Sequence, residues 1–89
     1  MTGQFPFTVK WGTRKWDHYQ RLSGELAETI NRVLSIVRTQ GVPLRERRAV
    51  MDEQVYLMVW QTEADDDVKR FFLEENGLTW QRYTELHGD

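Results

Sequence analysis

Apolar residues alternate with other residues near the start of the chain. Every second position is apolar over about 5–11, and this period of two predicts a half-buried strand. Pro6 lies inside the segment and has no N–H to donate to a strand ladder, so we expect an edge strand or one that begins after the proline. The alternating apolar positions are Phe5, Phe7, Val9 and Trp11.

Apolar residues then recur every three or four positions, which is the spacing of one face of a helix. This pattern predicts a long helix over about 14–40. Gly41 favours the left-handed conformation that closes a helix, and Pro43 cannot continue one, so both mark its end. The predicted buried stripe consists of Trp16, Tyr19, Leu22, Leu26, Ile30, Val33 and Val37.

The segment after the proline shows no clear helical period. Its first part is polar, and six consecutive apolar residues follow at 55–60. Short apolar runs that contain valine and aromatic residues are typical of buried strands, so we interpret about 44–62 as a β-hairpin. Helical spacing then returns and predicts two C-terminal helices, over about 64–76 and about 80–87.

The order β-α-β-β-α-α predicts an α+β fold for a single domain that spans 1–89. A strand, a crossover helix and a hairpin combine into a three-stranded antiparallel sheet of order 1-3-2, with the helices on one face. The third strand is then central and apolar on both faces, so the face away from the helices needs a cover. The residues expected on this outer face are Tyr56, Met58 and Trp60.

This order of elements resembles the ferredoxin-like half of the dimeric α/β-barrel superfamily. The resemblance covers most of residues 5–75. It implies that two sheets pack face to face in a homodimer, and that a small ligand binds between sheet and helices. Because the superfamily includes monooxygenases, isomerases and other proteins, the resemblance implies no single reaction.

Charge is unevenly distributed along the chain. The 89 residues carry 12 basic and 14 acidic side chains, a net charge of −2. Residues 1–50 hold nine basic and four acidic side chains, whereas residues 51–89 hold three and ten. This polarity of +5 and −7 favours steering of a charged partner, or head-to-tail or two-fold self-association.

Composition excludes several classes of protein. The chain has 12% aromatic residues, too many for a disordered chain, and no cysteine for disulfides or thiolate metal sites. Its longest apolar run, six residues, is far shorter than the roughly 20 that span a bilayer. The start of the chain, Met1-Thr2-Gly3-Gln4, does not resemble a secretory signal, so we expect a cytoplasmic protein that needs no cofactor or metal.

We expect a small non-catalytic interaction module that acts through the apolar sheet face. It would form a homodimer or dock on another protein, as an inhibitor or regulator does. Aromatic residues and methionine are enriched in interface cores, so Tyr56, Met58 and Trp60 are the expected anchors. The expected polar contacts are Arg45, Arg47 and Arg48.

Two other functions are open at this stage. The resemblance allows a small-ligand-binding protein or an enzyme, for which His18 is the candidate catalytic residue. The basic N-terminal half allows binding of an anion or nucleic acid through Lys10, Arg14 and Lys15. A sequence isoelectric point of about 5.7 lies below the range of typical nucleic-acid-binding domains, which makes this last function the less favoured.

Overall fold

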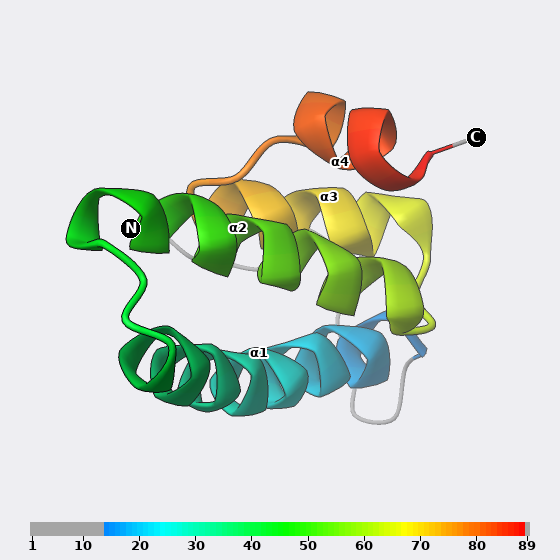
Figure 1. Cartoon of the computed structure of the whole chain (residues 1–89). Helices are drawn as coiled ribbons and strands as arrows, with labels where there is room; N and C mark the ends of the chain where they lie inside the picture. Colours follow the sequence, from blue (N-terminus) through cyan, green and yellow to red (C-terminus); the bar gives the residue numbers. More distant parts are fainter. Residues whose placement is uncertain (1–13, 89) are drawn as a thin grey trace.

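The computed structural model describes residues 14–88, and these residues form four α-helices (Figure 1). In chain order they are α1 (Arg14–Thr39), α2 (Leu44–Gln61), α3 (Asp66–Glu75) and α4 (Trp80–His87). No strand occurs in this described part of the chain. The strand expected over about 5–11 lies outside it.

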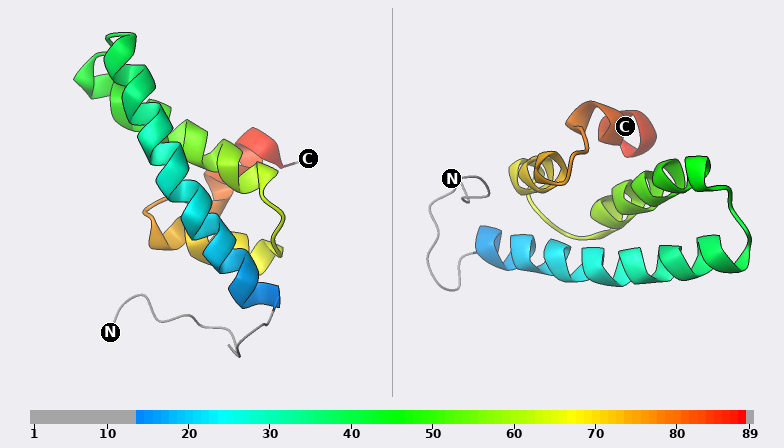
Figure 2. Two further views of the ribbon diagram at one scale, coloured as in Figure 1. Left: turned by 90° about the horizontal axis from the view of Figure 1, so that it is seen from below. Right: turned by 90° about the vertical axis from the view of Figure 1, so that its left-hand side faces the viewer.

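The helices are stacked in three layers. The long helix α1 forms one outer layer and contacts both α2 and α3. The short helix α4 contacts α2 and α3 from the opposite side, so that α2 and α3 make up the middle layer (Figures 1 and 2). Helix α2 is therefore covered on two sides, by α1 and by α4.

The hydrophobic core lies where these layers meet. Leu22 of α1, Val59 of α2 and Leu73 of α3 are completely buried. Each such side chain contributes about 1.5–3 kcal/mol relative to an exposed one. The buried residues of the core cluster are Leu22, Val55, Tyr56, Met58, Val59, Val68, Phe72, Leu73, Leu78 and Tyr83.

The predicted α+β, ferredoxin-like fold is wrong. The segment that we interpreted as a hairpin over 44–62 is the single helix α2, and residues 14–88 contain no sheet of order 1-3-2. The resemblance to the dimeric α/β-barrel superfamily is also wrong, because it depended on that sheet. Six consecutive apolar residues at 55–60 resemble a buried strand because α2 packs against α1 on one side and α4 on the other.

The remaining helices lie where helical spacing predicts them. Helix α1 corresponds to the helix expected over 14–40, and α3 and α4 correspond to those expected over 64–76 and 80–87. Helix α1 closes through Gly41, which has a φ of 67°, while the N–H of Val42 donates to the carbonyl of Val37 at 2.9 Å.

Helix α3 closes in the same way. Gly77 has a φ of 78°, and the N–H of Leu78 donates to the carbonyl of Leu73 at 2.9 Å. Helix α4 then begins at Thr79, whose hydroxyl accepts a hydrogen bond of 3.1 Å from the N–H of Arg82. None of the helices within residues 14–88 is both long and apolar enough to cross a membrane.

Candidate functional site

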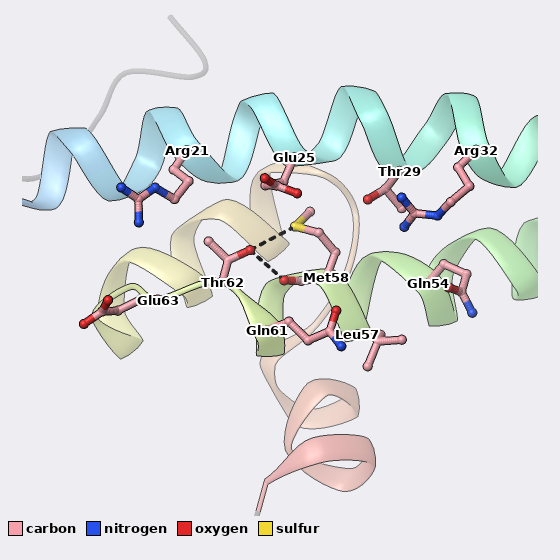
Figure 3. A pocket seen from close by; sticks show the side chains of 10 residues that line it. All are labelled: Arg21, Glu25, Thr29, Arg32, Gln54, Leu57, Met58, Gln61, Thr62 and Glu63. Carbon is pink, nitrogen blue, oxygen red and sulfur yellow. Dashed lines mark hydrogen bonds between the residues drawn. The ribbon is translucent and has the colours of Figure 1, made fainter.

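A cleft of about 420 Å³ lies between α1 and α2 and is bordered at one end by the turn that leads to α3 (Figure 3). This volume lies within the usual range of about 300–1,000 Å³ for ligand sites. Its lining is mainly polar. The residues that line it are Arg21, Glu25, Thr29, Arg32, Gln54, Leu57, Met58, Gln61, Thr62 and Glu63.

Helical spacing places these side chains on two facing walls. On α1, the residues at 21, 25, 29 and 32 are three or four positions apart and so share one face. On α2, the residues at 54, 57, 58 and 61 have the same relation. Figure 3 shows Arg21 and Glu63 near one end of the cleft and Arg32 and Gln54 near the other.

The floor of the cleft is buried. Thr29 is 1% exposed, Met58 is 5% exposed and Thr62 is 9% exposed. The hydroxyl of Thr62 donates to the carbonyl oxygen of Met58 at 2.8 Å and thereby fixes the end of α2 (Figure 3). Met58 also belongs to the hydrophobic core, so packing of the core holds this part of the floor in place.

The charged rim of the cleft is not neutralised internally. Arg21, Glu25, Arg32 and Glu63 make no side-chain hydrogen bond or ion pair with other residues in the described part of the chain. Arg21 and Glu25 stand four residues apart on α1, where such pairs often form. The rim thus presents two positive and two negative groups to whatever enters the cleft.

The cleft offers charged and polar groups to whatever enters it. Its lining contains no histidine, and its hydroxyl groups belong to Thr29 and Thr62. Within residues 14–88 there is no group of three or more side chains suited to hold a metal ion. The guanidinium, carboxylate and amide groups of the rim are instead suited to ion pairs and hydrogen bonds with a partner.

The three expected apolar anchors separate in the structure. Tyr56 and Met58 are each 5% exposed and belong to the core, whereas Trp60 is 51% exposed. Helical spacing turns Met58 away from the other two, whereas Tyr56 and Trp60 stand four positions apart on the same side of α2, where Tyr56 is covered and Trp60, in the last turn, is not. Of the three, only Trp60 presents a large surface to a partner, and Met58 reaches the floor of the cleft.

The three expected polar contacts lie in the first turns of α2. Arg45 and Arg48 are exposed, whereas Arg47 is half-buried and donates from Nε to the carbonyl of Val42 at 2.8 Å. Arg48 forms an ion pair of 3.1 Å with Asp52, one turn further along α2. These arginines surround the turn between α1 and α2, at the far end of the helix pair from Trp60.

The basic residues at the start of α1 bind helix α3 and the turn before it. Arg14 forms an ion pair of 3.2 Å with Asp65, and Lys15 forms one with Asp67. The hydrogen bond from Lys15 lowers the pKa of the Asp67 carboxyl. Both cations thus have a structural role in joining α1 to α3. Lys10, the third residue of this expected anion site, lies outside the described residues.

Tyr19 also joins α1 to α3. Its hydroxyl donates to the carboxylate of Glu75 at the end of α3, and its ring lies 6.2 Å from that of Phe72. Burial and, to a lesser extent, the hydrogen bond with Glu75 raise the pKa of Tyr19 to about 12.

His18, the candidate catalytic residue, lies beside Tyr19 on α1, outside the cleft lining. The Nδ1 atom of His18 is buried and has no hydrogen-bond partner within the described chain.

Sequence reasoning missed the cleft residues. The polar positions 21, 25, 29 and 32 are visible as one face of a predicted helix, and this spacing was the available signal. The facing wall was not recognised because its residues were assigned to a hairpin. Comparison of the chain with protein-family models, curated proteins and solved structures gives no match.

Proposed function

We propose that this protein is a small non-catalytic interaction module whose α1–α2 cleft binds a helical segment of a protein partner. The observation that carries the proposal is the unpaired charged rim above a buried floor. A cytoplasmic partner is part of the proposal, in line with the expectation from the sequence.

The order of charges along α1 defines the partner. Arg21, Glu25 and Arg32 present positive, negative and positive groups in sequence. At 1.5 Å per residue these groups stand about 6 Å and about 10 Å apart along the helix. A partner helix that lies along the cleft matches them when it carries acidic, basic and acidic residues at the same spacing.

The opposite wall supplies uncharged contacts. Gln54 and Gln61 stand two helical turns apart on α2, with Leu57 between them. Glutamine amides donate and accept hydrogen bonds, so they suit polar side chains of the partner, and Leu57 suits an apolar one. The buried Met58 adds an adaptable apolar surface at the floor.

A designed peptide tests the proposal. The probe is an alanine-rich helical peptide with Glu, Lys and Glu at the spacing of Arg21, Glu25 and Arg32, and its control carries Lys, Glu and Lys. By calorimetry we expect the protein to prefer the first peptide by about tenfold, because three partly screened ion pairs together contribute on the order of 1–2 kcal/mol.

A charge-reversed protein provides the matched test. The triple variant Arg21→Glu, Glu25→Lys, Arg32→Glu changes only exposed side chains and should fold normally. We expect it to prefer the control peptide. The variant Glu28→Lys, on the same helix but outside the cleft lining, should keep the original preference. Equal binding of both peptides, or no binding of either, would contradict the proposal.

A further inference from the structure

The two ends of the α1–α2 pair carry opposite charge. We call the turn between the helices, residues 36–48, the basic end. It holds four arginines and one acidic residue, Glu46, which gives a net charge of +3. The arginines are Arg38, Arg45, Arg47 and Arg48.

We call residues 14–17 and 63–67 the acidic end. They lie at the start of α1 and at the connection from α2 to α3, which are together at the opposite end of the helix pair (Figure 1). Five acidic and two basic side chains give this end a net charge of −3. The acidic residues are Asp17, Glu63, Asp65, Asp66 and Asp67.

Distance keeps these two charges apart within one molecule. Helix α1 has 26 residues and therefore extends about 39 Å between the two ends. The Debye length at physiological salt is about 8 Å, so the ends of one copy hardly interact. Each end is available to a charge on another molecule that approaches it closely.

Each end also exposes a large apolar side chain. Leu44 at the basic end is 80% exposed, the highest value among the exposed large apolar residues of the described chain. Trp60, in the last turn of α2 near the acidic end, is 51% exposed. An association that brings the ends together would remove both side chains from water.

We infer that copies of this protein associate head to tail, with the basic end of one copy against the acidic end of the next. Charge complementarity favours contact between unlike ends, because contact between identical ends brings like charges together. Contact between Leu44 of one copy and Trp60 of the next adds apolar burial. The interface is heterologous, so it builds a ring when the rotation closes and an open chain when it does not.

Sedimentation of the whole protein tests the inference. The mean mass should rise with protein concentration at low salt and fall when salt is added. Reversal of the basic end by Arg38→Glu with Arg45→Glu should abolish the rise. Reversal of the acidic end by Asp17→Lys with Asp66→Lys should do the same. All four residues are exposed and outside the cleft lining, so circular dichroism should show folded proteins.

Recombination of the reversed ends separates contact between unlike ends from contact between identical ends. In a chain that carries all four substitutions the former basic end has a net charge of −1 and the former acidic end +1, so we expect association to return, but more weakly than in the original chain. Glu28→Lys, in the middle of α1, should associate as the original chain does. A mean mass that never rises, or reversed ends that leave the rise unchanged, would overturn the inference. So would a fourfold variant that associates no more at low salt than the two variants with a single reversed end, or a basic end that binds a polyanion while the copies remain separate.

Discussion

The indole ring of Trp60 is stacked on the imidazole ring of His87, with 5.4 Å between the ring centroids and 18° between the planes. This contact joins the last turn of α2 to the last turn of α4. Since Trp60 is still 51% exposed, the stack leaves much of the indole in solvent. Helix α4 has only eight residues, so few contacts hold it in place and each has a measurable effect.

We expect His87→Ala to loosen the last turn of α4. Loss of the ring contact should lower the free energy of unfolding by about 0.5–1.5 kcal/mol. Hydrogen exchange should become faster at the amides of residues 84–88, beginning with that of Gly88, which donates to the carbonyl of Thr84. Gln81→Ala, on the exposed side of α4, serves as the control and should change little. Unchanged exchange in His87→Ala would show that the stack does not hold α4.

A hydrogen bond between α2 and the start of α4 also holds α4 in place. The N–H of Thr79 donates to the hydroxyl of Tyr56 at 3.1 Å, and Tyr56 is 5% exposed. We expect Tyr56→Phe to cost about 1 kcal/mol, because it leaves a partly buried N–H without an acceptor. Chemical denaturation measures this cost. Tyr56→Leu provides the comparison. It should lower the free energy of unfolding more than Tyr56→Phe does, because it removes the ring as well as the hydroxyl and leaves a cavity.

Two glycines should respond in opposite directions to alanine. Gly24 lies inside α1 with nothing within 4 Å of an added Cβ, so Gly24→Ala should raise the free energy of unfolding by about 0.5–1 kcal/mol. Gly41 has a φ of 67°, so Gly41→Ala should lower the free energy of unfolding by about 1 kcal/mol. Thermal unfolding compares the two variants. Equal shifts would argue against the left-handed end of α1.

The ion pair between Lys15 and Asp67 predicts a dependence on pH. The pKa of Asp67 is lowered in the folded protein, so the pair stabilises the fold above the ordinary carboxyl pKa and is lost as the pH falls through the lowered value. Because both side chains are partly exposed, Asp67→Asn should lower the free energy of unfolding by only about 0.5 kcal/mol at neutral pH.

The pH series has a matched control. Asp66→Asn removes a carboxylate from the same first turn of α3, so it reports the interaction with the helix dipole without the Lys15 pair. At neutral pH we expect Asp67→Asn to be the more destabilising variant. At a pH below the lowered pKa of Asp67, the difference between Asp67→Asn and the original chain should vanish. A difference that persists there would mean that the pair is not its source.

Part of the fold follows from local pattern. Leu22, Val33 and Val37 were predicted on one stripe of α1 from their spacing alone, and each is at most 2% exposed. The half of the candidate site that lies on α1 is visible in the same way, as polar residues on another face of that helix. The half on α2 could not be found, because a strand assignment sends Leu57 and Met58 to opposite faces of a sheet.

Some features of the sequence favour a helix over residues 44–61. Residues 51, 55, 58 and 62 follow helical spacing, and Arg48 and Asp52 form an ion pair one turn apart. The segment also contains no glycine to make a tight hairpin turn. The apolar run at 55–60 outweighed these signals, since a helix covered on two sides and a buried strand both lack a polar face.

The sequence by itself determined α1, α3 and α4, because each has a single buried face that the period of its apolar residues records. It also determined the left-handed turn at Gly41, which follows from local backbone chemistry. Only the tertiary structure decided that residues 44–61 form a helix between α1 and α4, that Tyr56 is buried while Trp60 is exposed, and that a charged cleft opens between α1 and α2. These features depend on which elements cover α2, and that information lies in contacts between segments distant along the chain.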